Sequence, residues 1–547
     1  MKRKRLIALM LTLIFIVAAF VGCTSQEDTT APTGKTTLPA ETTGGTVTSG
    51  REQLGYNPGK GMPDRIVPGT VLHASYLGQD FPQHLPWGAS SRTDIYDTLF
   101  TPYQGDYSDI RGNLVTDWKF ADDGLSITMQ VKQGVTFTNG NPLNAKAICD
   151  VFTNCHSQRT PQNFAKIESM EATGEYEMVF KFSAPYPDFV SRFTTGGICD
   201  PKMIEEYGMD DNRAAIGTGP YYIESYSTGE RLVLKANPNY HNPDKQPQIE
   251  TVILYVIPNQ ETAIASFLNG DLTFMKTQRM VDLYAVQDAP NFDDDNIIIY
   301  PSPSQPFWFN MDHNPMLQNK KVREAIVKMI DWQAVCDLAY DGINTPLVSI
   351  FPEGTPLYVD SSSHYYCDPQ EALQILQDEG IAPEDITFDI LTNPNFVNVV
   401  LAVQEQLAKF GVTVVVNQVD VASQLALMRE GQYDVTNSHL GYNPAISLSV
   451  FATTLTDRPV LPFMQFGNAD PELHSQLLDL YFRASTALTE EKMMELLIEL
   501  VTLIQENYAF MGGFRGYEFF FHTDNVKNIT PIGLTGNPEF CWFYIED

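Results

Sequence analysis

Two polar loops of this chain carry the residue types that best suit ligand binding. The loop over 392–395 follows one predicted strand and reads Thr-Asn-Pro-Asn, and the loop over 439–444 follows another and reads His-Leu-Gly-Tyr-Asn-Pro. Neither contains a lysine, an arginine or a carboxylate, although asparagine and proline are also ordinary turn formers. Neutral hydrogen-bonding groups of this kind suit a sugar or the uncharged backbone of a peptide. The candidate ligand-binding residues in and beside these loops are Asn393, Asn395, Asn437, His439, Tyr442 and Asn443.

Arg515, Trp308 and His439 raise other possibilities. Arg515 lies in a Gly-Gly-Phe-Arg-Gly run and could pair with a ligand carboxylate through its planar guanidinium group, or form an internal salt bridge. Trp308 could stack on a ligand, but a position in the core or at a hinge is favoured. His439 has no second metal-ligating residue nearby, which favours a structural role. We expect no metal and no cofactor.

Compact catalytic signatures are absent from the sequence. It contains no Gly-x-Ser-x-Gly or His-Glu-x-x-His pattern, and Gly217-Thr218-Gly219-Pro220 lacks the lysine and hydroxyl residue of a phosphate-binding loop. We expect these glycines to serve backbone geometry. A surface glycoside hydrolase is the alternative class, because paired carboxylates leave no compact signature and the chain holds 67 Asp and Glu residues. The expectation is nevertheless a protein that is not an enzyme.

A lipid modification site is predicted near the amino terminus. Four basic residues over 2–5 precede an apolar run from Leu6 to Val21, which is shorter than the ~20 residues that a bilayer span needs. Cys23 directly follows Gly22, as in a bacterial lipobox, where the cysteine thiol carries diacylglycerol. We therefore expect residues 1–22 to be a signal peptide and the mature protein to be lipid-anchored at the cell membrane, on its extracytoplasmic face.

Composition limits what the remaining chain can be. Residues 23–50 are dominated by Thr, Gly, Ser, Pro and Glu, which predicts a disordered stalk. The body of roughly 500 residues exceeds the size of a single core, so two or three lobes are expected. A formal net charge of -32 argues against nucleic acid and anionic lipid headgroups as partners. The six cysteines after Cys23 are widely spaced, which leaves both disulfides and buried thiols open.

The elements that position the two loops form an α/β pattern. A helical face runs over 319–340, and Asp368, Pro369 and Glu371 mark another helix start. Strands over 386–391, 412–419 and 433–438 then alternate with helices over 396–410 and 420–431. Short joints imply parallel strands, and in such sheets ligands bind beyond the carboxyl ends of the strands, where both loops lie. The region before residue 310 reads as α+β, with strands expected over 125–131, 136–138, 231–235 and 251–257.

Short motifs along the body match one family in order, although each is weak alone. They are Thr116–Leu125, Val131–Ala145, Gly217–Tyr221, Gly229-Glu230, Leu234–Tyr240, Ile257-Pro258, Ala263, Asn269–Asp271, Phe309-Asn310, Val322–Ile326 and Ile330-Asp331. From about Arg65 onward the chain resembles the family 5 extracellular solute-binding proteins, which are the oligopeptide, dipeptide and nickel receptors of ABC importers. The joint order of the motifs makes this resemblance specific.

The resemblance implies an α/β fold of the two-lobed periplasmic-binding-protein-like type (type II), with an extra α+β subdomain in the first lobe. Lobe I would comprise 51–306 and 516–547, with the subdomain at about 99–214, and lobe II would comprise 307–515. The ligand would lie between the lobes, and closure would be followed by delivery to an ABC permease and its ATPase subunits. The protein would act as a monomer that touches the membrane only through its lipid anchor.

Asn443 departs from the pattern of the peptide-binding members of that family. Those members place an aspartate near this position, where it pairs with the α-ammonium group of the peptide, but no acidic residue occurs here between Asp434 and Asp457. An unpaired buried ammonium group is costly, so a peptide with a free amino terminus is disfavoured. An oligopeptide or dipeptide is still the first expectation, followed by a sugar or other neutral polar solute and then a nickel chelate. A sensor that feeds a signalling partner also stays open.

Overall fold

The computed structural model describes residues 66–77, 94–103, 106–159, 161–340, 342–353, 355–437, 448, 451, 455, 468–529, 531–532 and 537–546. The predicted signal and stalk, with Cys23, lie outside these residues, as do the candidates His439, Tyr442 and Asn443. The chain divides into Met1–Gly50 and Arg51–Asp547, and the fold below is that of the second unit.

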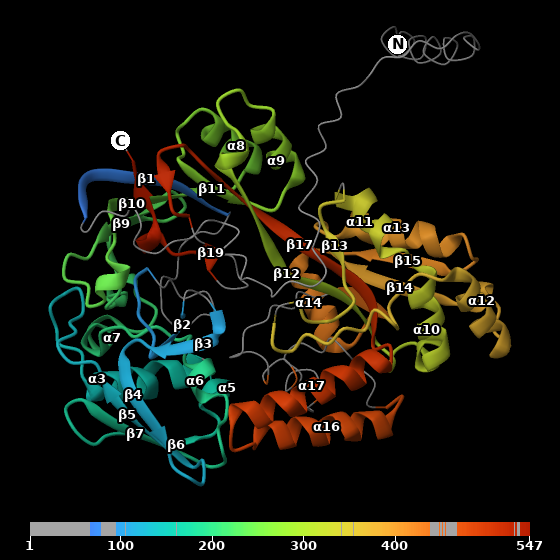
Figure 1. The fold of residues 1–547 in the computed structure, drawn as a ribbon, viewed down its shortest axis with the longest axis horizontal. Helices are drawn as coiled ribbons and strands as arrows, with labels where there is room; N and C mark the ends of the chain where they lie inside the picture. The colour runs from blue at the N-terminus through green and yellow to red at the C-terminus, as the bar shows by residue number, and fades with distance from the viewer. Residues whose placement is uncertain are drawn as a thin grey trace, which may run out of the picture. The chain divides into compact units, whose positions relative to one another are not determined.

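One large sheet organises the described part of the chain, where eleven strands join in it (Figure 1). Ten of them follow the order β15-β14-β16-β12-β17-β11-β1-β10-β9-β8, and β13 pairs with β17. The strands are β1 (Val67–Leu77), β8 (Tyr221–Ser227), β9 (Arg231–Ala236), β10 (Ile249–Ile257), β11 (Phe274–Thr277), β12 (Ile297–Phe309), β13 (Thr345–Pro346), β14 (Thr387–Thr392), β15 (Thr413–Gln418), β16 (Val435–Asn437) and β17 (Phe510–His522). The two longest, β12 and β17, run antiparallel through the middle of the sheet, from the pair Ile297–Phe521 to the pair Trp308–Phe510.

The predicted α/β pattern is confirmed at one end of this sheet. Strand β14 pairs in parallel with both β15 and β16, and helices α13 (Val397–Ala408) and α14 (Val421–Glu430) connect them. Helix α12 (Pro369–Asp378) begins where expected, because the Asp368 carboxylate accepts hydrogen bonds from the amides of Gln370 and Glu371. Asp420 caps α14 in the same way, and the helix ends at Gly431, whose φ of 69° lies in the left-handed region.

Two local predictions are wrong. The segment 319–340 is not one helix but two, α10 (Lys320–Met329) and α11 (Trp332–Tyr340), because Ile330 is extended and the Asp331 carboxylate accepts from the Ala334 amide to start a new helix. Residues 136–138 form no strand beyond an isolated bridge from Thr136 to Pro142. There the Phe137 amide donates to the carbonyl of Asn141, which closes a tight turn instead.

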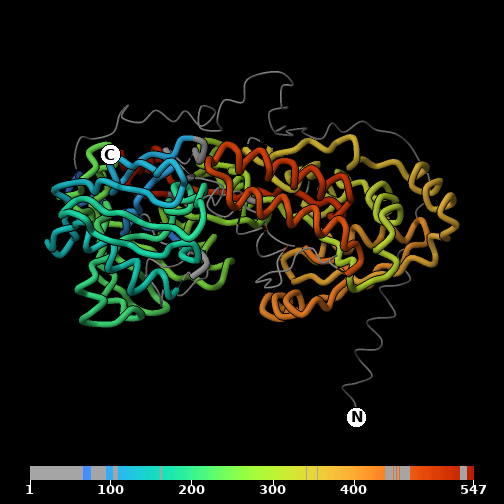
Figure 2. The backbone as a smooth tube through the Cα atoms, turned by 90° about the horizontal axis from the view of Figure 1, so that it is seen from below, coloured from blue at the N-terminus to red at the C-terminus, as the bar shows by residue number. Residues whose placement is uncertain are grey.

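A smaller α+β region is built around a four-stranded antiparallel sheet of order β4-β5-β7-β6. Its strands are β4 (Val115–Phe120), β5 (Ser126–Val131), β6 (Ile167–Ala172) and β7 (Glu177–Phe182), beside the pair β2 (Phe100–Tyr103) and β3 (Asp106–Gly112). Its helices are α3 (Ala145–Val151), α4 (Ser157–Arg159), α5 (Pro161–Phe164), α6 (Phe189–Arg192) and α7 (Pro201–Tyr207), with a π-helical turn over Phe152–His156. The long helices α16 (Pro471–Ser485) and α17 (Glu490–Glu506) lie beside this region in both views (Figures 1 and 2), where Lys166 Nζ donates to the carbonyl of Ser485.

Buried apolar side chains gather in three clusters. The members of the first run from Phe307 to Phe514, and those of the second come from both ends of the described chain, from Leu72 to Phe543. The third lies under α8 (Gln260–Leu268) and α9 (Met280–Gln287) and includes Phe519 and Phe521. Two small strand pairs complete the architecture, β18 (Val526–Lys527) with β21 (Tyr544–Ile545) and β19 (Pro531–Ile532) with β20 (Asn537–Pro538). The lobe boundaries stay a prediction.

The six cysteines that the structure describes are free thiols. Cys367 is exposed, and Cys149, Cys155, Cys199, Cys336 and Cys541 are buried. No helix in the described part of the chain is both long and apolar enough to cross a membrane.

Candidate functional site

Strands β14 and β16 end side by side, and a network of buried polar side chains joins their ends. Asn393 Nδ2 donates to Gln424 Oε1 (2.7 Å), and Thr392 Oγ1 donates to Asn437 Oδ1 (3.3 Å). Gln424 Nε2 in turn donates to Thr436 Oγ1 (3.3 Å). The structure therefore brings the candidates Asn393 and Asn437 together at the carboxyl edge of the parallel strands, as the strand-end argument predicts.

Asn395 differs from its neighbour in exposure. Its side chain is exposed, while its backbone amide donates to Asn393 Oδ1 (2.9 Å) and fixes the turn. The next residue, Phe396, has its ring centroid 6.2 Å from that of Phe514 on β17. The β14 loop thus lies next to the strand that carries Arg515, with the side-chain amide of Asn393 hydrogen-bonded within the fold and that of Asn395 exposed to solvent.

Trp308 lies in the core at the point where β12 meets β16. Its backbone pairs with Thr436, and the preceding residue, Phe307, pairs with Asn437. The indole is 2% exposed and its ring centroid lies 6.1 Å from that of Phe510. This burial agrees with the core position that the sequence favours.

Arg515 lies further along the same strand pair and is half-buried. Its backbone pairs with Ser304 of β12 and with Thr345 of β13. The Ser304 hydroxyl is fully buried and has no hydrogen-bond partner among the residues that the structure describes. A buried polar group without a partner is costly, so a ligand or a water molecule is expected to satisfy it.

Two glycines before Arg515 allow β17 to pass close to its neighbour β12 and to the indole of Trp332. Gly512 and Gly513 have φ values of 114° and 157°, which L side chains rarely adopt. A Cβ atom at Gly513 would overlap the carbonyl of Gln305, and one at Gly512 would overlap the indole of Trp332. The Gly-Gly pair therefore fixes the path of the strand on which Arg515 is carried.

Gln424 and Ser304 are the members of this site that the sequence prediction missed. Gln424 is buried on α14 four residues before the buried Met428, so a polar residue on an apolar helix face was the available signal. Ser304 lies in the Pro-Ser-Pro-Ser-Gln-Pro part of β12, which has no alternation of apolar and polar residues. The sequence there gives no signal of which strand face is buried.

Two of the motifs that carry the family resemblance, Gly217–Tyr221 and Leu234–Tyr240, meet elsewhere, at the buried carboxylate of Asp97. It accepts hydrogen bonds from Thr218 Oγ1 (2.8 Å), His241 Nε2 (2.8 Å), Tyr240 Oη (2.9 Å) and Asn113 Nδ2 (3.1 Å). Burial alone would raise the pKa of Asp97, but the hydrogen bond and charge of His241, with the bonds from Asn113 and Thr218, hold that pKa below its ordinary value. These residues hold the fold rather than a ligand.

Gly217 and Gly219 have a steric role in that motif. A Cβ atom on either residue would overlap the backbone of Ile95. This confirms the expectation that the glycines serve backbone geometry, since no side chain fits where the two segments pass.

Two hollows in the described surface lie away from the strand ends. One of about 710 Å³ is lined by Trp118, Tyr186, Glu490 and Met494 among others, and one of about 680 Å³ by Phe137, Asn141, Lys146 and Asp200 among others. Burial, reinforced by the charge of Asp188, raises the pKa of Glu490 above its ordinary value. Of the predicted ligand-binding residues that the structure describes, none lines either hollow.

The large sheet, with its parallel α/β end and central strand pair, has the fold of the type II periplasmic binding proteins. NikA from Brucella suis, in complex with Fe(III)-EDTA, matches with a TM-score of 0.77 at 18% identity, over 87% of this chain and 100% of that one. The oligopeptide-binding protein AppA from Bacillus subtilis, in complex with a nonapeptide, matches with a TM-score of 0.66 at 17% identity, over 87% and 99%.

The family follows from the sequence comparison. The model of the bacterial extracellular solute-binding proteins, family 5 (Middle), matches residues 109–459, and the chain belongs to this family. The oligopeptide-binding protein AppA of Bacillus subtilis (strain 168) is 24% identical over 486 residues, 82% of each chain. The "Probable D,D-dipeptide-binding periplasmic protein DdpA" of Escherichia coli (strain K12) is 25% identical over 338 residues, 60% of this chain and 64% of that protein.

The match to the DdpA relative thus spans just under two thirds of its length. The homologues are substrate-binding transport proteins and not enzymes, so the glycoside hydrolase alternative is set aside.

Proposed function

We propose that this protein is a lipid-anchored receptor of an ABC importer that captures a short peptide between two lobes and delivers it to a permease and its ATPase subunits. Family membership and the peptide-binding names of relatives support this function. The observation that carries it is the gathering of the polar ends of β14 and β16 beside the β12–β17 strand pair. In an open α/β sheet this is the edge at which a ligand binds, and closure of two lobes over it retains the solute. The receptor acts as a monomer.

Peptide recognition would use the backbone and the carboxylate end of the ligand. The network of Asn393, Gln424 and Asn437 holds the strand ends in place, and the exposed side-chain amide of Asn395 would hydrogen-bond a peptide group of the ligand. Arg515 would bind the ligand carboxylate through its guanidinium fork, beside the unsatisfied hydroxyl of Ser304. Because no acidic residue lies between 434 and 457, the α-ammonium group would stay near solvent or be blocked.

Native mass spectrometry of the full chain, purified without added ligand, tests the ligand class. Short peptides released on denaturation are the expected result. A single sugar would contradict the peptide assignment, and so would a metal chelate such as the one bound by the NikA neighbour.

Variants then test the role of Arg515. Arg515→Gln is expected to weaken binding of a released peptide at least tenfold, which corresponds to about 1.4 kcal/mol. Arg483→Gln is the matched control, because the Arg483 side chain is 54% exposed on α16 and forms an ion pair with Asp479 of the same helix. Unchanged affinity in Arg515→Gln would remove Arg515 from the site and leave the receptor function standing.

Lipid anchoring is predicted to depend on Cys23, which lies outside the described residues. Cys23→Ala removes the thiol that would carry diacylglycerol, so the protein should appear in the medium or keep its signal peptide. Metabolic labelling with a radioactive fatty acid, followed by fractionation, measures this directly. Unchanged labelling of the variant would contradict the anchor, and Cys367→Ser, at an exposed thiol of the body, is the control.

A further inference from the structure

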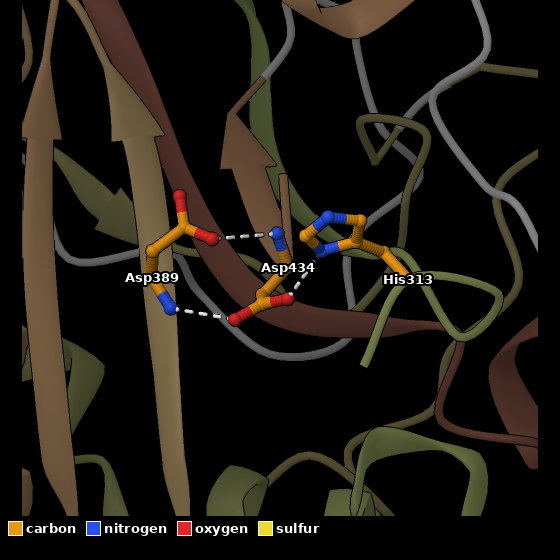
Figure 3. A group of neighbouring side chains, drawn as sticks. All are labelled: His313, Asp389 and Asp434. Atoms are coloured by element: carbon orange, nitrogen blue, oxygen red, sulfur yellow. Dashed lines mark hydrogen bonds and ion pairs between the residues drawn. The ribbon is translucent and has the colours of Figure 1, made fainter. Parts of the chain in front are cut away.

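Three potential metal ligands meet at the amino-terminal side of the parallel strands, away from the polar strand ends. One ligand atom each from His313, Asp389 and Asp434 lies within 4.8 Å of the other two (Figure 3). His313 follows β12, Asp389 lies within β14, and Asp434 directly precedes β16. The group combines one imidazole nitrogen with carboxylate oxygens. Its three residues come from separate parts of the chain, all between Phe307 and Phe514, the stretch that supplies the first hydrophobic cluster.

Backbone hydrogen bonds fix both carboxylates. Asp434 Oδ2 accepts from the Asp389 amide (2.9 Å) and from Asn314 Nδ2 (3.0 Å), while Asp389 Oδ1 accepts from the Asp434 amide (3.0 Å). Each carboxylate is thereby oriented through one oxygen. Among the described residues, the other oxygen of Asp389 has a single long bond, from Asn417 (3.4 Å), and the other oxygen of Asp434 is turned to the His313 ring. In protein metal sites, hydrogen bonds of this kind orient the carboxylates that bind the ion.

His313 is held on the same frame but keeps access to solvent. The His313 backbone amide donates to Asn310 Oδ1 (3.2 Å), and the Asn310 backbone amide donates to the carbonyl of Asp434 (2.8 Å). His313 Nδ1 lies 2.7 Å from Asp434 Oδ1, and the side chain is 47% exposed. An ion could therefore reach the group from solvent, and the ring has room to turn toward it.

The charges of the group are unbalanced. In the part of the chain that the structure describes, neither carboxylate forms an ion pair with a lysine or an arginine, and the one ionic partner is the His313 ring on Asp434. Two carboxylates that share a partly buried site repel each other. A divalent cation would neutralise the charges of both carboxylates, whereas the imidazole can neutralise at most one.

We propose that His313, Asp389 and Asp434 form a site for a divalent transition-metal ion, with Zn²⁺ as the best chemical match. A mixed set of one imidazole and two carboxylates suits Zn²⁺ better than Ca²⁺ or Mg²⁺, which favour oxygen alone. Ligand atoms at about 2.1 Å from Zn²⁺ lie roughly 3.4 Å apart. The widest separation in the group, up to 4.8 Å, must therefore close by as much as about 1.4 Å, and the 2.7 Å between His313 Nδ1 and Asp434 Oδ1 must open. The half-exposed His313 ring can turn to supply part of this movement. The site is separate from the solute site and independent of the proposed transport function.

Calorimetric titration of Zn²⁺ into the full chain tests the site, after alkylation of accessible thiols so that Cys367 cannot bind the ion. The wild type should bind one Zn²⁺ saturably, and Ca²⁺ should bind at least tenfold more weakly. His313→Ala and Asp389→Asn should each weaken Zn²⁺ binding at least tenfold. Asp385→Asn is the matched control, because this exposed carboxylate lies four residues before Asp389 and outside the group, and it should bind as the wild type does.

Three results would contradict the proposed Zn²⁺ site. No saturable Zn²⁺ binding by folded wild type would reject it, and so would equal affinities in the wild type, His313→Ala and Asp389→Asn. Equal binding of Zn²⁺, Ca²⁺ and Mg²⁺ would indicate only the general attraction of an acidic surface. His313→Ala changes an exposed ring, so circular dichroism should show that it folds normally. Arg515→Gln should leave Zn²⁺ binding intact, because it alters the solute site alone.

Discussion

Asp200 accepts hydrogen bonds from the side-chain amides of both Asn139 and Asn141 on one carboxylate oxygen (2.7 and 2.6 Å). Its other oxygen caps α7 through the Lys202 amide. Asp97 likewise accepts from Thr218 and Tyr240, so at the scale of single side chains these four motif residues act as hydrogen-bond donors to buried carboxylates. Asp97 and Asp200 each receive several hydrogen bonds, which offset the cost of burying a charge.

His156 provides a prediction of pH dependence at this scale. Burial lowers its pKa to about 4, against which its hydrogen bond to the carbonyl of Gly197 acts weakly. The unfolded chain takes up a proton on this histidine near pH ~6.5, whereas the folded chain resists it down to about 4. The stability contributed by neutral His156 is therefore present above pH ~6.5 and falls by about 1.4 kcal/mol per pH unit between these values.

Denaturant unfolding at pH 7 and at pH 5 measures this effect in the wild type and in His156→Gln. The variant should lose less stability between the two pH values than the wild type does. Equal losses would show that His156 does not control acid stability. The comparison is internal, so other titrating groups cancel to first order.

At the scale of elements, Arg323 of α10 joins two segments that are far apart in sequence. Its buried guanidinium group donates to the carbonyls of Leu317 (2.7 Å), Asn507 (2.8 Å) and Tyr508 (3.0 Å), so it satisfies the carboxyl end of α17. Burial lowers the pKa of Arg323 to about 10, and the group stays charged at neutral pH. Arg323, which belongs to the Val-Arg-Glu-Ala-Ile motif on α10, thus caps the carboxyl end of a different helix, α17.

Arg323→Met is predicted to lower the free energy of unfolding by about 3–5 kcal/mol, because it leaves buried carbonyl groups without donors. Arg323→Lys should lose less, since a single ammonium group reaches fewer of these carbonyls. Arg483→Met, on the exposed pair with Asp479, should change stability by less than about 1 kcal/mol. Chemical denaturation of the three variants provides the measurement, and a loss in Arg323→Met no larger than in Arg483→Met would contradict the capping role.

The sequence predicts local elements well where their signals are local. The cap at Asp368, the stop at Gly431 and the alternation of strands and helices after residue 386 all appear in the structure. The split between α10 and α11 was missed because Asp331 interrupts a hydrophobic period that continues on both sides. Of the candidate site, Asn393 and Asn437 could be predicted from strand ends, but Gln424 and Ser304 could not, since their burial depends on packing between distant segments.

At the scale of the whole molecule, contacts link the small α+β region to the helical pair α16–α17. Lys166 of the small region donates to the carbonyls of Ser485 and Pro185, and burial lowers its pKa. The hollow of about 710 Å³ lies along the same boundary. If solute binding brings the predicted lobes together, a bond across this boundary favours the closed arrangement.

Lys166→Met should therefore weaken solute affinity several-fold without touching the solute site, because it removes a contact that favours closure. Titration with the peptide recovered from the purified protein measures the affinity, and small-angle X-ray scattering should show a smaller decrease in radius of gyration at equal peptide concentration. Lys146→Met is the control, since its pair with Asp150 is exposed. Unchanged affinity in Lys166→Met would remove this boundary from the closing mechanism.

The pairing of β12 with β17 has a consequence for how such receptors diversify. The cluster from Phe307 to Phe514 is continuous in sequence, and its two ends meet where Phe307 pairs with Gly512. A gene segment encoding this stretch could therefore be exchanged between relatives by recombination at only two junctions, which adjoin in space. The solute-contacting residues proposed on this stretch could change in one event while the remainder, which carries the predicted anchor, is inherited intact.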